Sequence, residues 1–160
     1  MAAADALTHA PGGYGPGAPP ADDTWTGTGV RFPLRPLPAG AGGSGPAADG
    51  RPGAPAWLSG TAVIRQSIET ILDTEPGERV MRPTFGCGLR RHLMAPNTPA
   101  TRTAIGAEIG EALTRWEPRI RVTEVAVTPG EEPTMVWIDI AYIRLLDLRP
   151  DNLVYPFYLR

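Results

Sequence analysis

The sequence predicts an α+β fold: a single domain with two main helices packed on a small, mostly antiparallel sheet, plus a Gly/Pro/Ala-rich N-terminal tail. Apolar residues recur at helical spacing over 63–72 and again over 105–116, whereas alternating apolar residues dominate after residue 120. A helix-rich half followed by a strand-rich half favours α+β over alternating βαβ units. At 160 residues the chain has room for one main core.

Two stretches have the composition of tails and linkers. Residues 1–24 are rich in alanine, glycine and proline, and we interpret them as an N-terminal extension of a domain spanning 25–160. A second Gly/Pro-rich stretch at 38–55 is interpreted as an insertion in that domain. Between the two, residues 30–34 alternate apolar and polar side chains, which predicts a short strand with Pro33 at a sheet edge.

The first predicted helix follows Ser59, a candidate N-cap, and should end near Asp73 because proline and glycine come soon after. Glycine and proline then predict turns around a short extended piece, Val80-Met81, and a turn of helix follows at 89–94.

Thr98 and Pro99 predict the start of the second helix, which runs to Trp116. Gly106 and Gly110 lie on one face of it, where they would allow close approach of another backbone or are simply tolerated.

Three strands are predicted after this helix. The first, 120–128, changes the parity of its valines, which predicts a bulge near Thr123-Glu124. A hairpin loop at 129–133 joins it to a strand at 134–146. The core face of that strand is predicted to be Val136, Ile138, Ile140, Tyr142 and Leu146. In the last strand Leu153, Tyr155, Phe157 and Leu159 alternate, and Pro156 indicates an edge strand, which can recruit a strand of another chain.

The turn between the second helix and the first of these strands carries Glu117, Pro118 and Arg119. Pro118 cannot continue the helix, so the chain must turn here. On spacing alone, the two charges are interpreted as a surface ion pair at a helix stop, which contributes little stability.

Composition and motifs exclude several functions. The formal net charge is −2, so nothing favours binding to nucleic acid or to an anionic membrane. No apolar run is long enough to span a bilayer, and the N-terminus does not have the form of a secretory signal, so we expect a soluble protein without membrane insertion. All 15 basic residues are arginine, a side chain that binds carboxylates through two parallel hydrogen bonds.

The chemistry-bearing side chains are few. Cys87 is the only cysteine, expected as a small thiol in a glycine-rich turn, and with two scattered histidines it predicts no metal site. No cofactor-binding motif is present, and no catalytic residue is predicted. Glycoside hydrolysis needs two carboxylates about 5–10 Å apart. Nothing in the sequence pairs any two of the candidate acids, which are Glu75, Glu78, Glu117 and Asp139.

Four segments, in this order, resemble the gene-twenty-five-like baseplate wedge proteins of contractile phage tails, whose relatives occur in type VI secretion and in extracellular contractile injection systems. They are Ile64–Ile68, Gly77–Leu89, Trp116–Arg119 and Asn152–Tyr158. The resemblance covers about Trp57 to Arg160. It implies a fold like the handshake domain of the sheath protein, assembly in the cytoplasm, and a final place in the baseplate of a phage tail or injection system.

The resemblance also implies partners and sites. Glu117, Pro118 and Arg119 match the motif that docks on the helical core bundle of the other wedge proteins. The last strand matches the edge that accepts arms of sheath subunits; its residues are Leu153, Val154, Tyr155, Pro156, Phe157, Tyr158 and Leu159. Hub, spike and tube-initiator proteins are further partners of a baseplate position. With these roles, Arg119→Ala is expected to lose wedge binding and to leave the isolated fold largely intact.

Two alternatives remain beside this adaptor role. Some members of the family carry a lysozyme-like label, so one alternative is a cell-wall glycosidase carried on the tail. The other is a regulatory module that binds a different protein through the same sheet edge.

Overall fold

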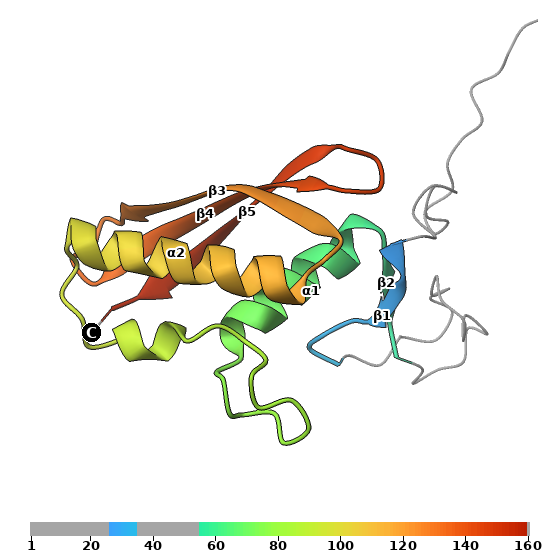
Figure 1. Ribbon diagram of the computed structural model, residues 1–160, viewed down its shortest axis with the longest axis horizontal. Coiled ribbons are helices and arrows are strands. Elements are labelled where there is room, and N and C mark those ends of the chain that lie inside the picture. The colour runs from blue at the N-terminus through green and yellow to red at the C-terminus, as the bar shows by residue number, and fades with distance from the viewer. Residues whose placement is uncertain (1–25, 35–54, 160) are drawn as a thin grey trace, which may run out of the picture.

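The computed structural model describes residues 26–34 and 55–159 (Figure 1). The predicted N-terminal extension, residues 1–24, and all but the last residue of the predicted insertion at 38–55 lie outside the described residues.

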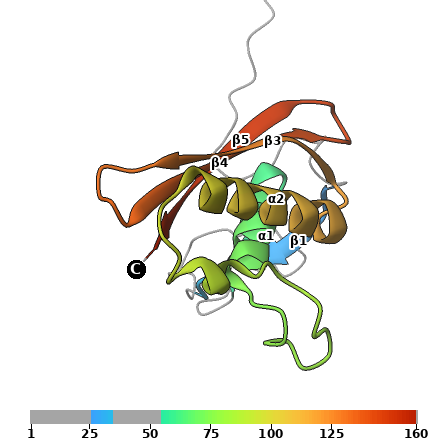
Figure 2. The same ribbon diagram turned by 60° about the vertical axis from the view of Figure 1, so that its left-hand side comes forward.

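The predicted α+β architecture is confirmed. Helices α1 (Thr61–Asp73) and α2 (Pro99–Trp116) pack against one face of a three-stranded antiparallel sheet (Figures 1 and 2). The sheet consists of β3 (Ile120–Pro129), β4 (Met135–Arg144) and β5 (Pro150–Tyr158), in the order β3-β4-β5. A short 3₁₀ helix, η2 (Leu89–His92), confirms the helical turn predicted between the helices.

The core lies between the helices and the sheet, and β4 is its central strand. The even-numbered residues of β4 alternate into the core, as the period of two predicts, and those from Val136 to Tyr142 are buried. The prediction was wrong for Leu146, which lies beyond the strand and is exposed. The register of β3 against β4 shifts between Val122 and Glu124, which confirms the predicted bulge.

The second helix begins where the sequence predicts. The Thr98 hydroxyl accepts a hydrogen bond from the Thr101 N–H at 3.2 Å, and Pro99 is the first helical residue. A Cβ placed at Gly106 would lie 3.4 Å from the Val125 carbonyl oxygen, so an alanine would just fit between α2 and β3. No described atom comes within 4 Å of a Cβ placed at Gly110, so of the two glycines only Gly106 faces β3.

The beginning of the domain differs from prediction. Ser59 is not an N-cap: it ends strand β2 (Trp57–Ser59), and Gly60, with a φ of 65°, turns the chain into α1. The partner strand β1 is Thr28–Val30 rather than 30–34, because its residues pair in antiparallel register with β2. A separate two-stranded sheet thus replaces the predicted single edge strand. The bounds of β1 depend on its pairing with β2, which lies far away in sequence.

The predicted extended piece at Val80-Met81 is also wrong. Both residues lie in turns of a loop that projects from the end of α1 (Figure 1). Cys87 is buried at the base of this loop, as expected for a small packed thiol. None of the described helices combines the length and the apolar character needed to cross a membrane.

Candidate functional site

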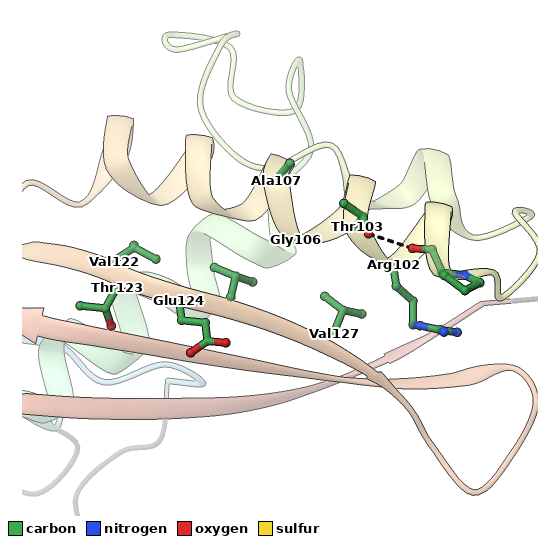
Figure 3. Close-up of a pocket in the computed structure, with 10 residues that line it drawn as sticks. Arg102, Thr103, Gly106, Ala107, Val122, Thr123, Glu124 and Val127 are labelled. Atoms are coloured by element: carbon green, nitrogen blue, oxygen red, sulfur yellow. Dashed lines mark hydrogen bonds between the residues drawn. The ribbon is translucent and has the colours of Figure 1, made fainter.

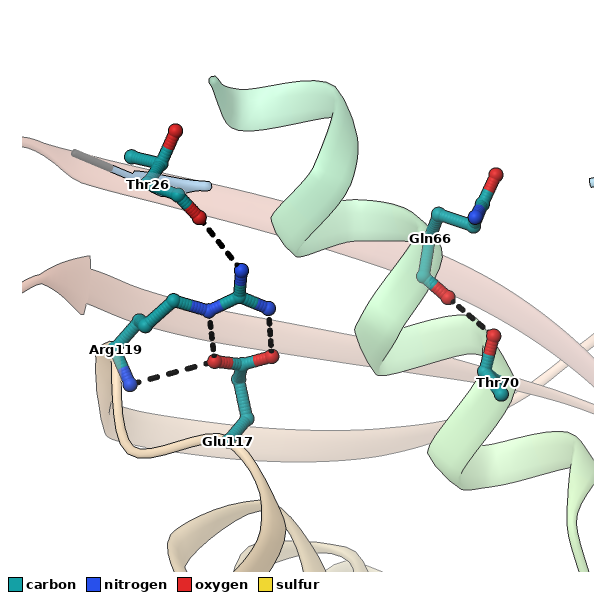
Figure 4. Close-up of polar contacts among 5 residues, drawn as sticks. All are labelled: Thr26, Gln66, Thr70, Glu117 and Arg119. Carbon is teal, nitrogen blue, oxygen red and sulfur yellow. Dashed lines mark hydrogen bonds and ion pairs between the residues drawn. The ribbon is translucent and has the colours of Figure 1, made fainter. Parts of the chain in front are cut away.

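The turn between α2 and β3 holds a buried ion pair. Glu117 caps the helix through its N–H, which donates to the Leu113 carbonyl at 2.9 Å, and only 1% of its surface is exposed. Arg119 binds the Glu117 carboxylate through two parallel hydrogen bonds: Nε donates to Oε1 at 2.6 Å and Nη2 donates to Oε2 at 2.5 Å (Figure 4). The short turn at Pro118 brings the two side chains back toward each other.

The same guanidinium connects two distant parts of the chain. Nη1 of Arg119 donates to the carbonyl oxygen of Thr26 at 2.8 Å (Figure 4). Thr26 is buried and lies two residues before the start of β1. The interpretation as a surface ion pair was therefore wrong, because the pair is folded into the domain by a segment 93 residues away in sequence.

Electrostatics keep the pair charged. Burial raises the pKa of Glu117, but hydrogen bonds from Arg119 and Ser67 outweigh burial, so the pKa of this carboxyl lies below its usual value. The hydrogen bond to Glu117 raises the pKa of Arg119 in turn. A carboxyl held ionised in this way is unsuited to be the general acid of a glycosidase, which needs a raised pKa.

What this turn offers to a partner is its outer surface. Pro118 is exposed, and about a third of the Arg119 side chain is accessible (35%). Beside it lies a mostly apolar pocket of about 300 Å³, which sequence reasoning missed. Its lining residues are Thr26, Ile64, Arg119, Arg144, Leu145 and Leu146. The available signal was the apolar pair Leu145-Leu146, which the sequence assigned to the core strand.

Arg144, which lines the pocket, is held by other residues of the chain. Two nitrogens of Arg144 are engaged, Nη1 with the Thr61 hydroxyl at 2.5 Å and Nη2 with Asp147 at 2.6 Å. Its buried Nε has no hydrogen-bond partner among the described residues. A pocket with apolar walls and the partly accessible guanidinium of Arg119 suits an apolar side chain next to a carboxylate or a carbonyl group.

The strand β5 lies at the edge of the sheet, as Pro156 predicts. The N–H of Leu159 donates to the Thr134 carbonyl at 2.6 Å, so odd-numbered residues of this strand hydrogen-bond with β4. Even-numbered residues therefore direct their backbone groups to the outer edge. There Val154 and Tyr158 supply N–H donors, and Pro156 between them supplies only a carbonyl.

The side chains of β5 divide between fold and surface. Leu153 and Leu159 are buried, and Phe157 packs against the core. The Tyr155 hydroxyl hydrogen-bonds with Asp73 at the end of α1. Among the predicted edge residues, the structure thus leaves the backbone and side chains of the even-numbered ones for a partner.

A second sheet edge, missed by sequence reasoning, borders a groove between β3 and α2 (Figure 3). The groove has a volume of about 550 Å³ and is lined by Pro99, Arg102, Thr103, Gly106, Ala107, Val122, Thr123, Glu124, Val125 and Val127. The Gly130 N–H donates to the Met135 carbonyl, so beyond the bulge the even-numbered residues of β3 hydrogen-bond with β4. The backbone groups of Val125 and Val127 therefore point to the outer edge. Gly106 was the only local signal of this arrangement.

The four candidate acids lie in three different parts of the fold: a loop, the turn after α2 and strand β4. Glu75 accepts a hydrogen bond from the Arg90 N–H, and Glu78 forms an ion pair with Arg90 at 2.9 Å and accepts from the Glu75 N–H. Glu75 and Glu78 thus lie in one loop, where both carboxylates are bound by hydrogen-bond donors of the same chain. Asp139 is exposed on β4, on the face of the sheet away from the helices.

The two helices on a three-stranded antiparallel sheet, the buried Glu-Pro-Arg turn and the matching family model together place the chain in a class of protein: structural components of contractile-tail baseplates. The chain belongs to the family described as baseplate wedge protein gp25, whose model matches residues 58–147, more than half of the chain.

Individual relatives agree with the family. Over 62 residues the chain is 40% identical to baseplate protein W of Escherichia phage P2, covering 39% of this chain and 54% of that protein. Over 83 residues it is 31% identical to baseplate wedge protein gp25 of Enterobacteria phage T4, covering 52% of this chain and 63% of that protein. The matches thus span less than two thirds of the length of either curated relative.

One similar solved structure carries a different description. It is a protein of Geobacter sulfurreducens provisionally described as a tail lysozyme, with 43% sequence identity and a TM-score of 0.58. The match covers 62% of this chain and 90% of that one.

Proposed function

We propose that the chain is a structural adaptor of a contractile-tail baseplate, which links the core bundle of the wedge to the first ring of sheath subunits by β-strand pairing. The observation that carries the proposal is the outer edge of β5, to which no strand pairs within the described residues of a chain that belongs to a baseplate wedge family. An added strand gains affinity from main-chain hydrogen bonds and specificity from alternate side chains.

The edge of β5 limits how a sheath arm pairs with it. Backbone N–H donors are available at Val154 and Tyr158 but not at Pro156. Opposite the proline, the arm can therefore donate a hydrogen bond to the Pro156 carbonyl but receives none in return. A strand shifted by one residue presents its other face to the sheet. The proline thus supports a single register for the arm.

The opposite end of the adaptor is the turn at Glu117, Pro118 and Arg119 with the adjoining pocket. Because Arg119 already binds Glu117, the accessible part of its side chain and the apolar pocket beside it are what a wedge partner meets. We propose that the core bundle inserts an apolar side chain here, next to an acceptor that reaches the exposed part of Arg119.

The test of the sheath contact is a pair of substitutions at one position. Val154→Pro removes an N–H that faces the outer edge, whereas Val154→Ala trims a half-exposed side chain and keeps the N–H. We expect the proline variant to lose binding to the cognate sheath subunit and the alanine variant to retain it. Unchanged binding of Val154→Pro would show that β5 is not the contact.

Substitution is a sharper test than deletion of residues 155–160, because the deletion also removes the buried Leu159 and the hydrogen bond between Tyr155 and Asp73. If the sheath arm instead pairs with the second edge, Val125→Pro will abolish binding and Val154→Pro will not.

The glycosidase alternative is favoured by the description of the Geobacter protein and by a second observation. A pocket of about 300 Å³ near Cys87 is lined by two carboxylates one helical turn apart on α2, Glu108 and Glu111. Glu108, however, is already engaged within the chain: the Arg91 Nε donates to its Oε2 at 3.0 Å, and the His92 Nε2 lies 2.8 Å from the same oxygen.

If the chain hydrolyses purified cell wall, and both Glu108→Gln and Glu111→Gln abolish this activity, the adaptor hypothesis would be rejected in favour of a glycosidase. Absence of hydrolysis, with binding to sheath subunits retained, supports the adaptor. A regulatory module, the third possibility, would bind neither sheath nor wedge proteins.

A further inference from the structure

The loop between α1 and η2 ends in a compact projection at residues 77–83, which we call the knuckle. It extends away from the helices and the sheet in both views of the molecule (Figures 1 and 2). The N–H of Gly77 donates to the carbonyl of Pro83 at 2.7 Å, so the two ends of the knuckle are held together. Gly77 has a φ of 100°, a conformation that favours glycine.

Further contacts make the knuckle a preformed structure. The Arg82 N–H donates to the Arg79 carbonyl at 3.1 Å, which closes a turn at the tip. The Arg79 guanidinium lies 3.9 Å from the centre of the Phe85 ring, and Phe85 in turn packs on Trp116 at the end of α2. The knuckle is thus connected to the core at its base.

At its tip the knuckle presents two large apolar side chains to solvent. Val80 and Met81 are each 92% exposed, the highest values among the exposed large apolar residues of the described chain. They contribute nothing to the core and lie between two exposed arginines, Arg79 and Arg82. Within the described residues neither guanidinium forms an ion pair.

A preformed loop with apolar side chains at its tip is suited to insertion into a partner. Ordering of a flexible loop would oppose binding, and the hydrogen bond between Gly77 and Pro83 has already ordered this one. Large apolar side chains that enter a pocket carry much of the free energy of a protein interface, and methionine adapts its shape to the pocket.

We propose that the knuckle is a docking element that inserts Val80 and Met81 into an apolar pocket on a neighbouring baseplate subunit, with carboxylates at the rim of the pocket to pair with Arg79 and Arg82. The charge of the tip selects the partner: two arginines flanking the apolar pair match an acidic rim and disfavour a basic one. This inference rests on the proposed function, since it places the partner in the baseplate.

The same chemistry also suits an anionic membrane surface, where arginines pair with phosphate groups and apolar side chains enter the acyl region. The baseplate family of the chain favours a protein partner. Binding to a membrane is therefore an outcome of the test rather than the proposal.

The experiment uses the full chain, co-expressed with the cognate wedge proteins and purified as a complex. A photoreactive benzoylphenylalanine replaces Met81, and the crosslinked peptide is identified by mass spectrometry. Val80→Ser/Met81→Ser and Arg82→Glu are compared with wild type for incorporation into the complex. Met94→Ser is the matched control, because Met94 is 80% exposed but lies outside the knuckle.

We expect a crosslink to one wedge subunit, in an apolar segment that contains aspartate or glutamate. Incorporation of the double serine variant should fall by about tenfold or more, and that of Arg82→Glu should fall too. Met94→Ser should behave as wild type. Since the exposed side chains leave the core untouched, the thermal midpoint of every variant should stay within about 2 °C of wild type.

Several outcomes would overturn the inference. One is normal incorporation of the double serine variant, and another is the absence of any crosslink, or a crosslink to a segment without carboxylates. Flotation of the wild-type chain with phosphatidylglycerol vesicles, lost in the double serine variant, would assign the knuckle to a membrane. If the double serine variant is incorporated normally but sheath binding still depends on Val154, the inference about the knuckle fails and the proposed function stands. A wild-type chain that joins no wedge complex overturns both.

Discussion

Removal of the Arg119 side chain tests whether the Glu-Pro-Arg turn serves the fold as well as a partner. The sequence alone predicts that Arg119→Ala leaves the isolated domain largely intact, but the structure argues for the opposite. Truncation removes the two hydrogen bonds that the Arg119 side chain donates to Glu117, whose side chain is only 2% exposed, and also the bond to the Thr26 carbonyl. An uncompensated charge then remains in the core.

Breaking a buried ion pair from one side costs roughly 3–5 kcal/mol. Because a third of the Arg119 side chain is accessible, water can reach the carboxylate after truncation, and we reduce the expected loss to about 2–3 kcal/mol. For a domain of this size, such a loss lowers the thermal midpoint by about 6–12 °C.

The assay is urea unfolding of the isolated protein, together with a thermal scan. A double variant, Glu117→Leu/Arg119→Met, serves as the control, because replacing both partners with apolar side chains leaves no unpaired charge. We expect its stability to lie within about 1 kcal/mol of wild type. An Arg119→Ala protein as stable as wild type would refute the reasoning and return the motif to a purely partner-binding role.

Three further predictions concern stability. Because the pKa of Glu117 lies below its usual 4.5 in the folded protein, its contribution is complete above about pH 5 and is lost as the pH falls through the folded pKa; acid unfolding of Glu117→Gln should lack this part of the slope. Gly86→Ala should prevent folding or cost more than about 3 kcal/mol by urea unfolding, since φ is 114° and the new Cβ would lie 2.1 Å from the Thr74 carbonyl oxygen; an alanine variant of normal stability would contradict this. Thr98→Ala should cost about 1 kcal/mol through loss of the helix cap on the Thr101 N–H, whereas Thr98→Ser should restore it.

Local patterns predicted much of this domain. Thr98 and Pro99 mark the start of α2 because a cap and a fixed φ act within one turn of helix. The change of parity around Thr123 predicted the bulge, and Pro156 predicted the edge strand, because each follows from the backbone chemistry of a few neighbouring residues.

The errors share a different physical origin. Ser59 is a good N-cap by type, but pairing with Thr28 places it in a strand. Val80 and Met81 have strand-forming and apolar character, yet the hydrogen bond between Gly77 and Pro83 folds them into turns. In each case the conformation depends on a contact with another residue, which the propensities of the individual residues do not reveal.

The sequence by itself determined the α+β class, the second helix, the three-stranded sheet and the family, since these depend on periodicity, turn chemistry and ordered motifs. Only the tertiary structure decided that Glu117 is buried, that Arg119 reaches the Thr26 carbonyl, and that α2 and β3 enclose a groove. The physical reason is that burial and pairing depend on which distant segments meet, and the energy of a charged pair changes several-fold between surface and core.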